Sequence, residues 1–236
     1  MRTAIFIPAR LDSTRLPKKM LCSIKEQPLI AHTIDRAKES EIKNIFLATD
    51  SEEIVDAVTH KNIQTILTST LNQSGSDRVY EALTKADPDE KHFDHIINLQ
   101  GDLPFISPEI INHLKNKIES STADIVTLIA PIIDQNKINN PNFVKVAISF
   151  YDQSCTSGRA LYFSRQPIPH NATTYYEHIG IYAYKRPALK KFIGTPCTHL
   201  EEQESLEQLR AYALDLNIEA HLVDSPPISV DTPDDL

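Results

Sequence analysis

The first half of the sequence alternates short apolar runs with amphipathic segments, and this alternation constrains the fold more than any other feature. The predicted strands, the first two of them unbroken apolar runs, span residues 5–9, 45–48, 63–67 and 95–99. Helical signals lie between and after them. Residues 28–39 have an apolar helical period, and Ser51 precedes two acids as a helix cap would. Further helices are predicted over residues 77–85 and from Pro108 onward. The pattern predicts an α/β fold with a doubly wound, mostly parallel sheet, in which ligands bind beyond the carboxyl ends of the strands.

The second half of the sequence is less regular. Residues 125–133 and 143–150 predict two long strands, which we expect to form an antiparallel extension of the sheet. A further strand is predicted over 179–184 and a helix over 202–214. The sequence has no internal repeat, low-complexity segment or linker, so we expect residues 1–236 to form a single domain.

The loop after the first predicted strand concentrates positive charge. Its cations alternate with serine, threonine, leucine and proline; they are Arg10, Arg15, Lys18 and Lys19. Arginine offers a fork of donors to phosphate oxygens, and lysine offers a point charge. Prolines at both ends of the segment restrict its conformations. We therefore interpret the loop as a phosphate-binding site, in preference to a solvated run of charges.

Composition excludes several classes of function. A net charge of −8 and a pI near 5.6 argue against nucleic acid and membrane surfaces as partners. The sequence shows no apolar run long enough to span a membrane and no signal-peptide pattern. Its three cysteines are widely spaced, which predicts reduced thiols and a cytoplasmic location. With five glycines and neither a Rossmann nor a Walker motif, phosphate binding must depend on side chains.

Several short motifs follow one another along the whole chain. The first half contains I-P-A-R-L-D-S-T-R-L-P-K-K-M-L (7–21), A-T-D (48–50), S-G-S-D-R (74–78) and L-Q-G-D (99–102). The second half contains Y-F-S-R-Q-P-I-P (162–169), H-I-G-I-Y-A-Y (178–184), S-L-E-Q-L-R (205–210) and V-D-T-P-D-D-L (230–236). In this order, the set closely resembles the 3-deoxy-manno-octulosonate cytidylyltransferase (CMP-Kdo synthetase) family.

The resemblance implies a reaction and its partners. The anomeric hydroxyl of 3-deoxy-D-manno-octulosonate (Kdo), an acidic sugar, would attack the α-phosphorus of CTP and release pyrophosphate. The product, CMP-Kdo, would supply lipopolysaccharide synthesis. The family requires Mg²⁺ and forms homodimers, so both are expected here. Residues 1–120 would mainly bind CTP, and residues 121–236 would mainly bind the sugar and form the dimer.

The resemblance also assigns roles to individual residues. The nucleotide would contact Ala9, Arg10, Ser13, Arg15, Lys19, Ser76, Arg78 and Gln100. The groups that neutralise charge during catalysis would be Arg10, Arg15, Lys19 and Asp102. The sugar would contact Gln100, Arg165, His178, Tyr182, Glu207 and Gln208. Mg²⁺ would be held by Asp102 and Asp231.

The residues alone leave some of these roles open. Asp102 at the end of a strand favours a functional role over a turn residue, whereas the pattern around Asp231 fits a helix cap equally well. Without the resemblance, His178 would be read as a core histidine. Glu207 and Gln208 are neighbours on the predicted helix, so their side chains diverge by about 100° and cannot both face the core.

The sequence departs from the family at a few positions and leaves two alternatives. Leu103 replaces a glutamate next to the expected metal ligand, and a glycine expected before the first helix is Glu26 or a neighbour. The same reaction on an 8-amino Kdo analogue or another acidic sugar is one alternative. The other is a non-catalytic nucleotide- or sugar-binding protein with the same fold.

Overall fold

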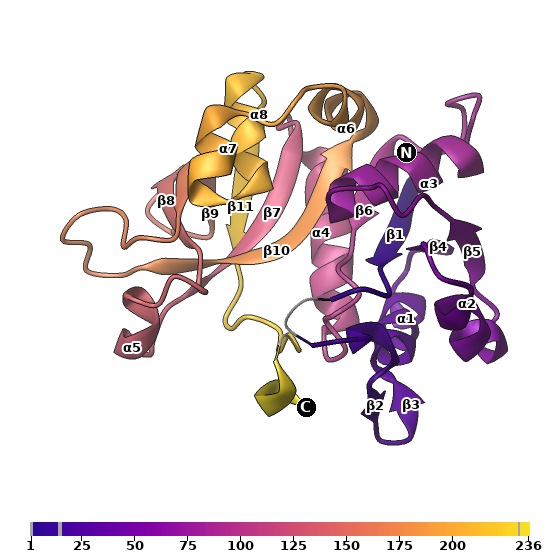
Figure 1. Ribbon diagram of the computed structural model, residues 1–236. Coiled ribbons are helices and arrows are strands. Elements are labelled where there is room, and N and C mark those ends of the chain that lie inside the picture. The colour runs from indigo at the N-terminus through magenta and orange to yellow at the C-terminus, as the bar shows by residue number, and fades with distance from the viewer. Residues whose placement is uncertain (1, 14–15, 231) are drawn as a thin grey trace. The chain divides into compact units, whose positions relative to one another are not determined.

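The computed structural model describes residues 2–13, 16–230 and 232–236 (Figure 1). The chain forms two compact units, residues 1–119 with 227–236, and residues 120–226. The first boundary lies beside the 120/121 division that we expected between a nucleotide half and a sugar half. The last ten residues, however, return to the first unit. Within the described residues, every helix is too short or too polar to cross a membrane.

The sheet of the first unit is fully parallel. Its strands are β1 (Thr3–Ala9), β4 (Asn44–Thr49), β5 (Gln64–Leu67) and β6 (His95–Asn98), in the order β5-β4-β1-β6. All seven residues of β1 are buried, as its unbroken apolar run predicts for a strand covered on both faces. The predicted α/β class with a mostly parallel sheet is confirmed.

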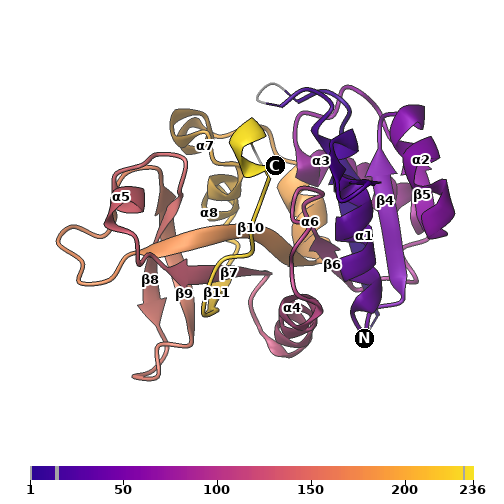
Figure 2. The same cartoon turned by 90° about the horizontal axis from the view of Figure 1, so that it is seen from below.

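Four helices connect or follow these strands. They are α1 (Leu29–Glu39), α2 (Glu52–Val58), α3 (Gly75–Ala86) and α4 (Pro108–Ser120). The connections through α1 and α2 step outward from β1 to β5, whereas α3 leads back across the sheet to β6. Because such connections are right-handed, the reversal places α3 on the opposite face from α1 and α2. Figure 2 shows α1 in front of the sheet, where it packs against β1.

Short elements join β1 to α1. They are the 3₁₀ turn η1 (Lys19–Leu21) and a hairpin of β2 (Ser23–Ile24) and β3 (Gln27–Pro28). The two loop residues of the hairpin, Lys25 and Glu26, have φ angles of 46° and 67°. Glycine adopts such angles without strain, which explains why a glycine was expected near this position.

The second unit is built on a mixed sheet. Its strands are β7 (Ile125–Pro131), β8 (Lys145–Phe150), β9 (Ser157–Ser164), β10 (Tyr176–Lys185) and β11 (Ile218–Leu222), in the order β10-β7-β11-β9-β8. All its pairings are antiparallel except that of β7 with β11. The expected antiparallel portion is present, although the sequence did not predict β9, β11 or the one parallel pair. The long strand β10 is visible in Figures 1 and 2.

The prediction of one continuous helix over residues 202–214 is wrong. The structure has α7 (His199–Glu204), the 3₁₀ turn η3 (Glu207–Leu209) and α8 (Arg210–Ala213), and Ser205 with φ 52° ends α7. The fold instead forms a buried ion pair, in which Arg210 Nε lies 2.9 Å from Glu201 Oε2. In one continuous helix these residues would be about 13 Å apart along the axis, so the pair requires the break. The remaining helices of this unit are α5 (Gln135–Ile138) and α6 (Arg186–Ile193).

Gly158 in β9 permits a close approach of two strands. A Cβ at this position would lie 2.3 Å from the Ser149 oxygen and 2.7 Å from the Phe150 Cα, both in β8.

We expect Gly158→Ala to destabilise the protein by about 1–3 kcal/mol, because the backbone of β8 or β9 must move to relieve the overlap. Thermal melts measure this. The matched control is Gly180→Ala, since a Cβ at position 180 meets nothing within 4 Å. Equal melting temperatures for the two variants would contradict the prediction.

Candidate active site

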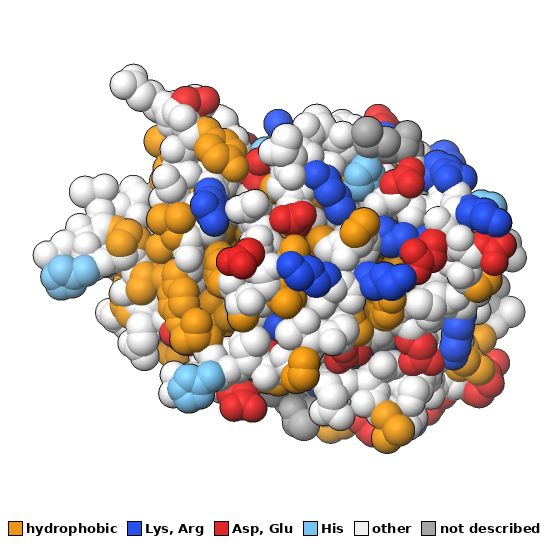
Figure 3. Space-filling view, turned by 90° about the horizontal axis from the view of Figure 1, so that it is seen from above, with side chains coloured by type: hydrophobic (Ala, Val, Ile, Leu, Met, Phe, Trp, Pro, Cys, Tyr) orange, Lys and Arg blue, Asp and Glu red, His pale blue; other side chains and the backbone are white. Residues whose placement is uncertain are grey.

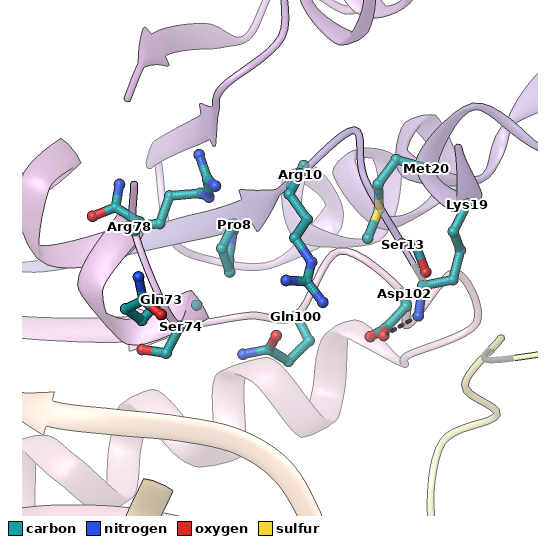
Figure 4. A pocket seen from close by; sticks show the side chains of 13 residues that line it. Pro8, Arg10, Ser13, Lys19, Met20, Gln73, Ser74, Arg78, Gln100 and Asp102 are labelled. Atoms are coloured by element: carbon teal, nitrogen blue, oxygen red, sulfur yellow. Dashed lines mark hydrogen bonds and ion pairs between the residues drawn. The ribbon is translucent and has the colours of Figure 1, made fainter. Parts of the chain in front are cut away.

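A polar pocket lies beyond the carboxyl ends of β1 and β6, where the sequence predicted a ligand site. The cavity has a volume of about 240 Å³ (Figure 4). It is lined by Pro8, Ala9, Arg10, Ser13, Lys19, Met20, Asn72, Gln73, Ser74, Gly75, Arg78, Gln100 and Asp102. Three cations therefore face one carboxylate. The N-terminus of α3 also contributes to the wall, and its dipole favours an anion there.

Lys19 and Asp102 form an ion pair on the pocket wall. Lys19 Nζ lies 2.7 Å from Asp102 Oδ2, and the Asp102 side chain retains 23% of its exposure. The Asp102 loop is held close to β1, because a Cβ at Gly101 would lie 3.0 Å from the Pro8 oxygen. Thr33 Oγ1 donates to the Gly101 carbonyl at 2.8 Å. Only glycine fits at position 101 without displacing this loop.

Arg10 is the exposed cation of the pocket. Figure 4 shows its side chain extending toward Gln100 and Asp102. Ser13 lies on the same wall as Lys19. Arg15, which we assigned to the triphosphate, lies outside the described residues.

Arg78, in contrast, is almost fully buried. Its guanidinium donates from Nη2 to Asp50 Oδ2 at 2.7 Å and from Nη1 to Thr68 Oγ1 at 2.6 Å. Arg78 thus lines the pocket as a cation already neutralised by a carboxylate.

Gln100 is oriented by a buried chain of hydrogen bonds. Its Nε2 donates to Asn98 Oδ1 at 2.9 Å, and Asn98 Nδ2 donates to Ser76 Oγ at 3.3 Å. Asn98 and Ser76 are both completely buried. Ser76 therefore lies behind the pocket wall, and direct nucleotide contact by Ser76 stays a prediction.

The sequence matches known proteins over almost its whole length. A family model described as cytidylyltransferase matches residues 4–218. A 3-deoxy-manno-octulosonate cytidylyltransferase of Bartonella bacilliformis is 43% identical over 236 residues, covering 100% of this chain and 96% of the relative. One from Rhizobium etli is 44% identical over 232 residues, covering 98% and 91%.

A solved structure also matches almost the whole chain. CMP:2-keto-3-deoxy-manno-octonic acid synthetase complexed with CTP superposes with a TM-score of 0.87 at 34% identity, covering 99% of this chain and 95% of that one. The chain belongs to the 3-deoxy-manno-octulosonate cytidylyltransferase family.

Two expected sugar-side residues of this cytidylyltransferase lie together in β10. The ring centroids of His178 and Tyr182 are 5.2 Å apart. Thr127 Oγ1 donates to the carbonyl of Ile181 at 2.8 Å and lies 3.0 Å from His178 Nε2. A hydroxyl has one proton, so His178 Nε2 must carry its own and donate it. Burial lowers the His178 pKa to about 3 and raises the pKa of Tyr182. His178 is therefore neutral at physiological pH.

The other expected sugar-side residues of the second unit are Arg165, Glu207 and Gln208. Arg165 donates to three backbone carbonyls, those of Glu204 at 2.9 Å, Pro141 at 2.9 Å and Ser205 at 3.1 Å. Gln208 is buried, whereas Glu207 is half-buried. The Glu207 Oε2 atom is nevertheless shielded from solvent, so neither side chain simply faces water. Sugar contact by any of them stays a prediction.

The sequence analysis missed part of the pocket wall. Asn72 and Gln73 precede the S-G-S-D-R motif and carry no signal of their own. Ser74 forms a reciprocal capping box with Asp77, and this S-x-x-D pattern was readable as a helix start at the site. Asp50 appeared in the sequence analysis only as part of the A-T-D motif and was given no role, yet it is the carboxylate partner of Arg78.

Leu103, the departure from the family glutamate, is only 6% exposed. We expect Leu103→Glu to destabilise the protein by about 2 kcal/mol or more, because a carboxylate would be buried without a partner. Thermal melts of Leu103→Glu and of the volume-conserving control Leu103→Met measure this. The alternative, that a glutamate here tunes a metal site, would appear as an unchanged melt together with a lower Mg²⁺ requirement for activity.

Proposed function

We propose that the chain transfers the cytidylyl group of CTP to the anomeric hydroxyl of Kdo. The hydroxyl oxygen forms a bond to the α-phosphorus, the bond from this phosphorus to the pyrophosphate oxygen breaks, and the hydroxyl proton is released. CMP-Kdo and pyrophosphate are the products, and CMP-Kdo serves lipopolysaccharide synthesis. The observation that carries the proposal is the pocket of Arg10, Lys19 and Asp102 in a chain that is 43% identical to a named cytidylyltransferase over its full length.

Charge neutralisation is the main contribution of the chain's own residues. Transfer at phosphorus needs stabilisation of charge on the phosphate oxygens and the leaving group more than covalent catalysis. Arg10 reaches over the pocket with an exposed guanidinium, and Lys19 is held at its wall. We assign both, together with Arg15, to the triphosphate and departing pyrophosphate. When an anion replaces Asp102 as the partner of Lys19, the Asp102 carboxylate becomes available to a cation.

Mg²⁺ is the cation whose chemistry fits this carboxylate. Magnesium is typically held by one or two carboxylates with waters and substrate phosphates, and not by a protein cage. Asp102 offers an oxygen ligand on the pocket wall, and the described residues contain no cluster of three or more potential ligands. The second proposed ligand, Asp231, lies outside the described residues; the preceding Val230 amide donates to the Asp102 carbonyl at 3.1 Å. Bound there, Mg²⁺ would supply positive charge to the phosphates.

We also propose that the protein is a homodimer. Figure 3 shows hydrophobic side chains gathered on the left of the view, over the second unit. Large apolar side chains of this unit are exposed, including Leu161 at 52% and Tyr151 at 59%. A second copy covering this surface would remove them from water. Sedimentation analysis tests the assembly.

A pyrophosphate-release assay with CTP, Mg²⁺ and Kdo tests the proposed reaction. We expect release that depends on all three, and faster release with Kdo than with 8-amino Kdo or other acidic sugars. Faster release with another sugar would retain cytidylyl transfer and overturn the assigned substrate. CTP binding without turnover on any sugar would instead indicate a non-catalytic binding protein.

Asp102→Asn is expected to lower turnover by about a hundredfold or more, because it removes a charge that the metal requires. Initial rates across a Mg²⁺ titration measure the effect. The matched control is Asp89→Asn, the same change at an aspartate that is 71% exposed in a surface ion pair. Near-normal turnover of Asp102→Asn at saturating Mg²⁺ would remove Asp102 from the metal site.

We expect substitutions in the proposed nucleotide site and in the proposed sugar site to change the Michaelis constants for different substrates. Lys19→Ala should raise the Michaelis constant for CTP, since the lysine would hold the triphosphate. Gln208→Ala and Arg165→Ala should mainly raise the constant for Kdo, by about tenfold if each removes one charged or well-placed hydrogen bond. Steady-state kinetics with each substrate varied in turn measure both constants. A change only in the CTP response of Arg165→Ala would show that its assignment to the sugar is mistaken.

A further inference from the structure

The Asp50 carboxylate holds two parts of the nucleotide pocket at once. Its Oδ1 accepts a hydrogen bond from the Leu11 amide at 3.1 Å, at the start of the cationic loop. Its Oδ2 accepts one from Arg78 Nη2 in α3 at 2.7 Å. The carboxylate itself follows the last residue of β4, so it connects a strand end, a loop and a helix.

This arrangement is buried. The Asp50 and Arg78 side chains are 12% and 4% exposed, and Arg78 also donates to Thr68 Oγ1 at 2.6 Å. Because the ion pair has so little exposure to water, solvent screens it weakly, and removing one partner leaves an uncompensated buried charge. Asp50 therefore fixes the position of the Arg78 guanidinium far more firmly than a surface ion pair would.

Arg78, one member of the pair, lines two cavities. Arg78 and Arg10 line the nucleotide pocket and also a neighbouring cavity of about 410 Å³, whose wall contains Asp50 and Leu11. Arg10 lies next to Leu11 in the chain, so the hydrogen bond from the Leu11 amide to Asp50 anchors the backbone from which the Arg10 side chain extends.

We propose that Asp50 is a positioning residue for nucleotide binding. It anchors the backbone beside Arg10 through the Leu11 amide and holds Arg78 in the pocket wall. The inference rests on the proposed function, because it takes CTP as the ligand of the pocket. Asp50 does not touch the nucleotide and acts through the two groups that it holds.

Simple charge counting gives the opposite expectation. A carboxylate near a triphosphate repels it, and removing that charge would free Arg78 as a cation, so CTP would bind more tightly. Positioning predicts weaker binding, because displacing a loop or a guanidinium by about 1 Å can reduce the contribution of that group by up to a hundredfold. The sign of the change in CTP affinity therefore distinguishes the two.

The test is CTP affinity of Asp50→Asn by isothermal titration, well below its melting temperature. We expect the dissociation constant to rise by about tenfold, with the Michaelis constant for Kdo within about twofold of the unchanged protein. CTP affinity within about twofold of the unchanged protein, whatever the melting temperature, would show a purely structural role and overturn the proposal. Tighter binding would overturn it in favour of charge repulsion. If the unchanged protein does not bind CTP, the proposed function fails instead.

Two further variants make the result specific. Glu53→Gln is the matched control, because Glu53 binds Lys18 of the same loop at 2.8 Å through an ion pair whose side chains are 49% and 59% exposed. Such exposed pairs contribute little, so we expect less than about a twofold change. Thr68→Val removes the hydroxyl partner of Arg78, which keeps Asp50 and a longer contact of 3.5 Å with the Ser69 carbonyl. It should weaken CTP binding by about threefold, the effect of one neutral hydrogen bond. If Asp50→Asn does not fold, Thr68→Val decides the question, because an unchanged CTP affinity of Thr68→Val would then overturn the proposal.

Discussion

Parallel pairing of β1 with β4 and β6 is the constraint on which the site depends. Because the three strands run in the same direction, the residues that follow them meet at one edge of the sheet. Arg10, Asp50 and Asp102 are far apart in the sequence and come together only through this pairing. A one-residue shift in the pairing of β1 would move Arg10 by one position relative to Asp50 and Asp102, so the register of these strands also fixes the geometry of the polar pocket.

Ion pairs let this acidic protein concentrate cations without strong self-repulsion. Lys19 is paired with Asp102 and Arg78 with Asp50, each at 2.7 Å, while Arg10 is exposed. The two pairs differ in burial: the Asp102 side chain keeps twice the exposure of Asp50, 23% against 12%. The more accessible pair can exchange partners when a nucleotide and a cation arrive, whereas the drier one is suited to hold the wall in place.

The sequence predicted the first unit well because its signals are local. An unbroken apolar run gives β1, and Ser51 ahead of two acids marks the start of α2, so neither requires knowledge of distant residues. The break at Ser205 could not be predicted in this way, because it depends on a buried pair between Glu201 and Arg210 across the turn. Strand β9 escaped prediction for a similar reason: its Gly158 suits a strand only because Ser149 and Phe150 of β8 lie against it.

The same distinction applies to the site. Motifs identified Arg78 as a cation near the nucleotide, yet its environment depends on Asp50 and Thr68, which come from two other strand ends. On the sugar side, His178 is kept neutral by burial, and Arg165 already donates to three carbonyls. His178 is thus a neutral residue, whereas Arg165 remains a cation whose guanidinium is oriented by its bonds to neutral carbonyls. Hydrogen bonds to hydroxyls discriminate between sugars of equal charge, so under the proposed assignment the neutral His178 would contribute to selection by the pattern of hydroxyl groups and Arg165 to recognition of the carboxylate.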